Sequence, residues 1–132
     1  MIEEESKKRG IYIPPGRQPW PHELRVAKIL AMAGHNIEFL PENHLRTADI
    51  KLDGIDYEIK SPESFNPNTL EHKLKDATRQ SGNIIIDSSR IKKTRDDKIR
   101  RFLVNQFRKQ PQIKKMLFIT KRGGIVDISA LV

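Results

Sequence analysis

The chain has no cysteine, few aromatic residues and no long apolar run, and each absence excludes a class of protein or site. Without cysteine there is no disulfide partner, no thiolate nucleophile and no cysteine-based zinc site. Any metal must then be held by carboxylates or histidine, which favours a hard cation such as Mg²⁺ or Mn²⁺. Because aromatic residues make up only 6% of the chain, a base-stacking platform is not expected.

Membrane and secretory signals are also missing. No apolar run approaches the roughly 20 residues that cross a bilayer. The first ten residues, "MIEEESKKRG", are charged where a signal peptide has an apolar core. We therefore expect no membrane contact and a cytoplasmic site of action. A length of 132 residues fits one domain, with residues 1–20 as an extended leader that packs Trp20 onto the body and residues 21–132 as the folded domain.

What the chain does have is positive charge in one place. The segment 90–122 holds 13 Lys and Arg against two Asp, a local charge of +11, whereas the remainder has 12 basic and 15 acidic residues and a charge of −3. A basic surface of this kind favours a polyanionic partner, because phosphate neutralisation releases counterions. The alternative is a solvated face that only keeps the protein soluble.

Apolar periodicity and turn residues predict alternating helices and strands. Residue 83 begins a short apolar run, "NIIID", which is typical of a strand covered on both faces and is reached through a helix. Such a crossover predicts a mixed β-sheet flanked by helices, of the α/β or α+β class. The expected order is α-β-β-β-α-β-α-β-β, in the segments 21–34, 35–40, 48–52, 56–60, 69–80, 83–87, 94–107, 116–120 and 125–129.

The stretch "ADIKLDGIDYEIK", residues 48–60, is the main candidate for chemistry. Glu58 and Lys60 leave the same face of a strand, and Asp49 stands across a two-residue turn from Glu58. Carboxylates of this kind hold a divalent cation in phosphodiester hydrolysis, and a neighbouring lysine orients water or stabilises the transition state. Glu23 on the first helix could complete the set. The alternative is a surface ladder of ordinary cross-strand ion pairs.

These residues, "AD" followed by "EIK", resemble the PD-(D/E)xK nuclease superfamily. The resemblance implies that Asp49 and Glu58 are metal ligands, that Lys60 is the catalytic lysine and that Glu23 is the helical carboxylate. Ala48 stands where that family has proline, a mild departure because the proline coordinates nothing.

A closer resemblance runs from Trp20 to the last strand, through "PWPHELRVAKILAMAG", "TADIKLDGIDYEIKSP" and "NTLEHKLKDATRQSGNIIID". The chain is similar to the C-terminal toxin domains of contact-dependent growth inhibition proteins, of the CdiA tRNase type. This resemblance implies cleavage of tRNA and neutralisation by a cognate immunity protein, which would be acidic.

A second nuclease fold stays open. Toxins of this kind also use the Barnase/EndoU/colicin/RelE fold, which cleaves RNA without a metal through attack of the 2′-hydroxyl. The residues that could serve such a reaction here are His22, Lys60, Thr69, His72 and Arg79, with His72 as the acid or base. Thr69 could also cap the second helix. The helical crossovers fit the PD-(D/E)xK layout better than a wholly antiparallel sheet.

Three functional hypotheses follow. The first is a nuclease, directed at tRNA, whose basic side chains position the substrate through its phosphates. The second is a non-catalytic nucleic-acid-binding module, and the third is an interaction protein whose basic face meets an acidic partner. The basic residues expected to bind substrate are Arg79, Lys92, Lys93, Lys98, Arg101 and Arg108.

Overall fold

The computed structural model describes residues 10–42 and 48–132. The described chain forms one mixed sheet of seven strands, which lie in the order in which they occur in the sequence. The strands are β1 (Ile11–Tyr12), β2 (Ile37–Phe39), β3 (Ile50–Leu52), β4 (Ile55–Lys60), β5 (Asn83–Asp87), β6 (Lys115–Ile119) and β7 (Ile125–Asp127). The expected mixed α+β class is confirmed.

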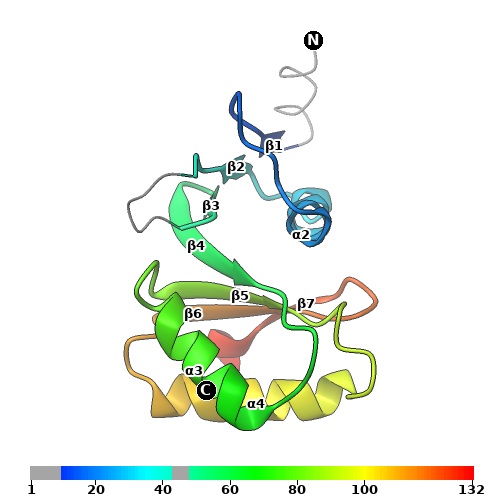
Figure 1. Ribbon diagram of the computed structural model, residues 1–132, viewed down its shortest axis with the longest axis vertical. Coiled ribbons are helices and arrows are strands. Elements are labelled where there is room, and N and C mark those ends of the chain that lie inside the picture. Colours follow the sequence, from blue (N-terminus) through cyan, green and yellow to red (C-terminus); the bar gives the residue numbers. More distant parts are fainter. Residues whose placement is uncertain (1–9, 43–47) are drawn as a thin grey trace.

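In the described part of the chain, three helices pack on the sheet (Figure 1). They are α2 (Pro21–Met32), α3 (Pro67–Ala77) and α4 (Asp96–Lys109), and a 3₁₀ turn, η1 (Ile128–Leu131), closes the chain. Residues 128 and 129, expected to extend the last strand, belong to this turn instead. Within the described residues, no helix combines the length and apolar character that a membrane crossing requires.

The two helical layers bury two separate cores. Val26, Ala27 and Leu30 of α2 pack on one face of the sheet against residues that include Ile59 and Ile85. Leu74 and Ala77 of α3 and Ile99 and Leu103 of α4 pack on the other face against Ile84 and Ile86. The strand "NIIID" is therefore covered on both faces, as expected, and β5 lies between two parallel neighbours.

Strand β4 changes partners halfway along its length. Its first half pairs antiparallel with β3, from Leu52↔Ile55 to Ile50↔Tyr57. Its second half pairs parallel with β5, from Glu58↔Ile84 to Lys60↔Ile86. The β3–β4 turn has φ of 51° at Asp53 and 84° at Gly54, the left-handed pair that a two-residue hairpin requires. Within the described residues, the β3–β4 pairing ends at Tyr57.

The expected leader is more structured than its sequence indicates. Its residues 1–9 lie outside the described part of the chain, but Ile11 and Tyr12 form β1, which pairs parallel with β2. Trp20 does not pack onto the body: it is 63% exposed and its ring stacks on His22. The residue that anchors this segment is Arg17, which is buried and whose Nε donates to the Leu40 carbonyl at 2.8 Å.

Candidate active site

Asp49, Glu58 and Lys60 converge where β4 leaves β3. Alternation along β4 places Glu58 and Lys60 on the face opposite Tyr57 and Ile59. Lys60 Nζ lies 3.3 Å from Glu58 Oε2. Continuing the β3–β4 register puts Asp49 opposite Glu58, and Asp49 Oδ2 accepts the Ile59 N–H at 2.8 Å. The Asp49 side chain thus replaces the next backbone partner of β4.

The surroundings of Glu58 shift the pKa of its carboxyl group. Burial and, after it, the negative charge of Asp49 raise the pKa of Glu58, Lys60 lowers it, and the net result is a pKa of about 7. Glu58 is only 7% exposed. Its Oε1 is buried and has no hydrogen-bond partner among the described residues. A buried carboxylate oxygen without a donor is costly unless a proton or a cation occupies it.

This arrangement fits a hard divalent cation. Asp49 and Glu58 supply two carboxylates, and the unpartnered Glu58 oxygen is available to a ligand. Across residues 10–42 and 48–132, no three acidic or histidine side chains come together as a metal-binding group. Two carboxylates are nevertheless the usual protein share of a Mg²⁺ site, with the other positions taken by water and phosphate oxygens.

Glu23 lies apart from this pair. Its Oε1 accepts the Trp20 N–H at 2.8 Å, and its Oε2 is 3.5 Å from Arg17 Nη2. Arg17 in turn binds the carbonyl of Leu40, and the Leu40 N–H donates to the Asp49 carbonyl at 2.9 Å. Glu23 therefore connects to the site through Arg17 and the end of β2, and within the described residues it makes no metal group with Asp49 and Glu58.

The residues of the metal-free alternative are dispersed. His22, at the start of α2, stacks on Trp20. Thr69 and His72 are exposed on α3. Thr69 does not cap the helix, because Asn66 does so by accepting the Thr69 N–H at 3.1 Å. Among the described residues, no hydrogen bond joins His22, Thr69 and His72. Lys60 is the member of that set that lies in the carboxylate cluster.

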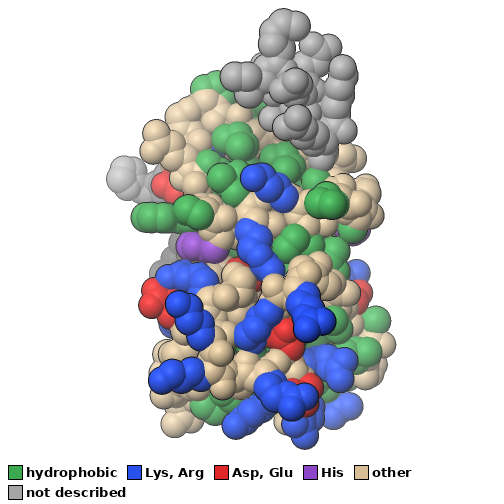
Figure 2. Space-filling model, turned by 90° about the vertical axis from the view of Figure 1, so that its right-hand side faces the viewer, with side chains coloured by type: hydrophobic (Ala, Val, Ile, Leu, Met, Phe, Trp, Pro, Cys, Tyr) green, Lys and Arg blue, Asp and Glu red, His purple; other side chains and the backbone are tan. Residues whose placement is uncertain are grey.

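Most of the expected substrate-binding cations are exposed on the lower part of the molecule. Figure 2 shows Lys and Arg side chains gathered there, with few acidic side chains among them. Arg79 pairs with Asp76 at 3.8 Å at the end of α3. Lys98 Nζ lies 5.7 Å from the centre of the Phe65 ring. The other exposed members are Lys92 and Lys93 in the β5–α4 loop and Arg101 and Arg108 on α4.

The sequence did not predict a partly buried ion pair between α2 and the end of β5. Asp87, at the carboxyl end of β5, is fully buried and bonds Arg25 Nη1 of α2 at 2.7 Å. Ser61, the residue after Lys60, donates to Asp87 Oδ2 at 3.1 Å. Arg25 also reaches the carbonyls of Thr120 and Lys121. One signal in the sequence could have indicated it: Asp87 ends a buried apolar strand. Because the carboxyl ends of parallel strands lie at the same edge of a sheet, Asp87 could be expected near the end of β4.

Comparisons with known proteins agree with this architecture. Among solved structures, the chain is similar to a CdiA-CT/CdiI toxin and immunity complex from Burkholderia pseudomallei, with a TM-score of 0.63 and 19% identity. That similarity covers 89% of this chain and 96% of the other. No curated protein matches the chain.

A family model, the contact-dependent growth inhibition CdiA C-terminal domain, matches residues 46–125. The matched region includes Asp49, Glu58 and Lys60 and begins after α2. It spans more than half of the chain, which therefore belongs to the contact-dependent growth inhibition CdiA C-terminal domain family.

Proposed function

We propose that this toxin domain is a nuclease that hydrolyses RNA phosphodiesters, with tRNA as its target, using a divalent cation held by Asp49 and Glu58. The observation that carries the proposal is the convergence of two carboxylates and an ammonium group where the β3–β4 pairing ends. The basic surface supports a polyanionic substrate. Membership in a toxin family supports a damaging enzymatic activity.

Each residue has a distinct part. Asp49 is fixed by the Ile59 N–H, so its carboxylate is oriented before substrate binds. Glu58 offers its unpartnered oxygen to the cation. Burial favours the protonated form of Glu58, so cation binding would release that proton. A cation held by these two carboxylates would supply activation of water and neutralisation of the charge that develops on the phosphate. Lys60, with its side chain 35% exposed, reaches substrate and donates to the attacking water or a phosphate oxygen.

Partners follow from charge and from the similar structure. That structure is a toxin and immunity complex. A chain of net charge +8 at pH 7 suits an acidic immunity protein as well as tRNA. We therefore propose two competing polyanionic partners, of which only tRNA is turned over.

Substitution at the cluster tests the proposal. Purified protein is incubated with total tRNA in Mg²⁺ or in EDTA, and the variants are Glu58→Gln and Lys60→Ala. We expect each variant to lose roughly 10²- to 10⁴-fold in single-turnover rate while keeping the wild-type circular dichroism spectrum. Matched controls on the same sheet are Glu38→Gln and Lys51→Ala, which remove exposed or half-exposed groups of β2 and β3.

The outcomes separate the alternatives. Cleavage that needs Mg²⁺ and both cluster residues supports the proposal, provided the controls retain activity. Cleavage in EDTA would favour attack by the 2′-hydroxyl and direct attention to His72. Tight, salt-sensitive binding to tRNA without turnover would leave a binding module and contradict the nuclease proposal.

A further inference from the structure

A hollow lies between the β4–α3 connection and the β5–α4 loop, the segments that follow the carboxyl ends of two neighbouring parallel strands. It has a volume of about 750 Å³, within the range of small-ligand pockets. Its walls come from two segments, Glu63–Phe65 on one side and Ser89–Thr94 on the other. The first of these segments begins three residues after Lys60, at the end of β4, and the second begins two residues after Asp87, at the end of β5.

Arg90 joins the two walls. Its Nη1 donates to the carbonyl of Ser61 at 3.1 Å, and its Nη2 pairs with Glu63. Because Ser61 follows Lys60 directly, the Arg90 contact fixes the hollow relative to the catalytic lysine. A group bound in the hollow would therefore lie at a set position with respect to a phosphate held at Asp49 and Glu58.

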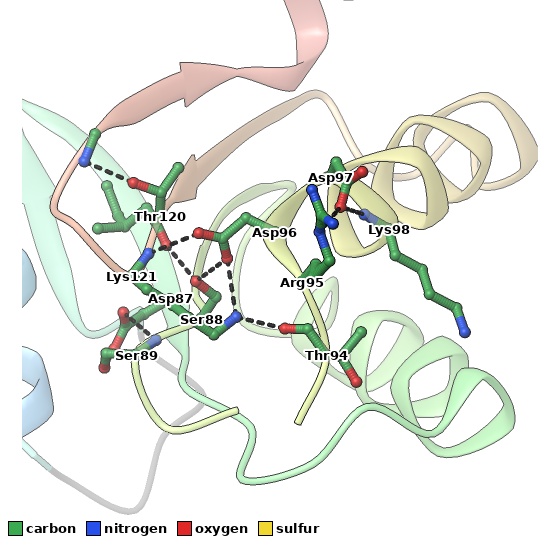
Figure 3. Close-up of polar contacts among 12 residues, drawn as sticks. Asp87, Ser88, Ser89, Thr94, Arg95, Asp96, Asp97, Lys98, Thr120 and Lys121 are labelled. Atoms are coloured by element: carbon green, nitrogen blue, oxygen red, sulfur yellow. Dashed lines mark hydrogen bonds and ion pairs between the residues drawn. The ribbon is translucent and has the colours of Figure 1, made fainter. Parts of the chain in front are cut away.

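The loop that carries the basic residues is anchored at both ends (Figure 3). At its start, Ser89 donates to Asp87 through its N–H at 3.0 Å and its hydroxyl at 2.8 Å. At its end, Lys121 Nζ donates to the Thr94 carbonyl at 2.6 Å and to Asp96 Oδ1 at 3.1 Å. The loop is thus held in shape before any ligand arrives, which lowers the entropic cost of binding.

Both carboxylate oxygens of Asp96 accept hydrogen bonds that anchor the loop. Burial alone would raise the pKa of Asp96, but hydrogen bonds from the Lys121 N–H, Ser88 and Lys121 Nζ outweigh it and hold the pKa below its ordinary value. The carboxylate therefore stays charged and paired with Lys121. It does not neutralise the lysines of the hollow.

Lys92 and Lys93 supply the unneutralised charge. Both are exposed, and within the described residues neither makes an ion pair or a side-chain hydrogen bond. The Glu63 carboxylate is taken by Arg90. Ser64 and Thr94 add hydroxyl groups, and Phe65 and Ile91 add apolar surface. Two free ammonium groups beside hydroxyls and a small apolar area are suited to a phosphate and its sugar.

We propose that this hollow binds a backbone phosphate of the substrate strand, next to the one that is cleaved. The inference rests on the proposed nuclease function and extends it. It separates Lys92 and Lys93, which would contact the strand at the site, from Arg101 and Arg108, which lie farther along α4. Phosphate contacts of this kind set the register of the strand and carry no base specificity.

The test compares Lys92→Ala/Lys93→Ala with a control of equal charge change, Lys114→Ala/Lys115→Ala, at the opposite edge where β6 begins. Steady-state cleavage of a single-stranded RNA oligonucleotide is measured in Mg²⁺. We expect KM to rise about tenfold in the first double variant, with kcat unchanged and little effect in the control. The slope of log KM against log salt should become shallower by about 0.7, for one phosphate that is no longer neutralised on a single strand.

Binding in a background of Glu58→Gln separates this inference from the nuclease proposal. In that background each oligonucleotide phosphate is replaced in turn by a neutral methylphosphonate. We expect one methylphosphonate to weaken binding to the protein that keeps Lys92 and Lys93. The same methylphosphonate should not weaken binding to the Lys92→Ala/Lys93→Ala variant. If cleavage is absent but this coupling is present, the phosphate subsite stands and the nuclease proposal fails. If cleavage occurs and the two double variants behave alike, or if no single phosphate couples to the lysines, the subsite is refuted.

Discussion

The two carboxyl oxygens of Glu58 have different surroundings. Oε2 faces Lys60 at 3.3 Å, whereas Oε1 is buried without a hydrogen-bond donor in the described part of the chain. Burial and the charge of Asp49 raise the pKa of Glu58 to about 7. The protein without metal therefore pays in stability for keeping this carboxylate ionised, as expected of a residue retained for function rather than for folding.

The raised pKa of Glu58 predicts that the stability of the protein depends on pH. The folded pKa of Glu58 lies above its ordinary value of 4.5, so the folded state holds a proton that the unfolded state has lost. The stabilisation is complete below pH 4.5 and disappears as the pH rises through 7. We expect Glu58→Gln to be the more stable protein at pH 8 without metal, by up to about 3 kcal/mol, and to lose this advantage near pH 5.

Urea unfolding from pH 5 to pH 8 in EDTA measures this difference. The control is Glu63→Gln, whose side chain is 77% exposed and which should show no such trend. Equal stability of wild type and Glu58→Gln at both ends of the range would contradict the account of Glu58. Adding Mg²⁺ at pH 8 should stabilise the wild type and leave Glu58→Gln unchanged.

At the scale of elements, Asp87 and Arg25 connect α2 to the sheet edge beside the site. Asp87 is fully buried, and it holds Arg25, Ser61 and Ser89. Removing its carboxylate would leave the half-buried Arg25 guanidinium without its charged partner and would remove the buried acceptor of the Ser61 and Ser89 hydroxyls. We expect Asp87→Ala to lower the free energy of unfolding by about 3 kcal/mol.

The comparison is Asp56→Ala, which breaks the exposed pair with Lys51 and should change stability by less than about 0.5 kcal/mol. Urea denaturation of both variants supplies the measurement. A loss at Asp87 no larger than that at Asp56 would show that the Asp87–Arg25 pair does not hold α2 to the sheet.

Elements whose signals are local could be predicted from the sequence. The Asp53–Gly54 turn fixes a two-residue hairpin, and that hairpin places Asp49 opposite Glu58 only nine residues away. Alternation then puts Lys60 on the same face. The central residues of the candidate site were accessible for this reason: turn chemistry and strand period determine their relation without knowledge of the rest of the fold.

Features that depend on distant partners could not be predicted. The short strand β1 exists because it pairs with β2, 26 positions along the chain at Ile11↔Ile37, and nothing in "IYIPPG" indicates this. Arg25 and Asp87 are 62 residues apart. Trp20 was expected to pack onto the body but is 63% exposed, and Arg17 is buried instead, with its guanidinium over the Phe39 ring.

At the scale of the whole molecule, the candidate active site and the most basic segment come from different parts of the chain. The segment 90–122, with its charge of +11, supplies α4 and the loop beside the hollow, whereas Asp49, Glu58 and Lys60 come from the less basic part of the chain. Affinity and chemistry should therefore respond to different conditions. We expect binding of tRNA to Glu58→Gln to weaken roughly a hundredfold between 50 and 200 mM salt, measured by filter binding. A salt-independent affinity would contradict phosphate-directed binding.

The chemistry of the product ends tests the central claim most directly. Single-turnover cleavage of tRNA in Mg²⁺ is followed by analysis of the new 3′ ends. Attack by water at a site built from Asp49, Glu58 and Lys60 forms no 2′,3′-cyclic phosphate at any time, and the reaction stops in EDTA. A cyclic phosphate that accumulates in EDTA as well as in Mg²⁺ would mean that the 2′-hydroxyl is the nucleophile, and would contradict the metal-dependent site proposed for this domain.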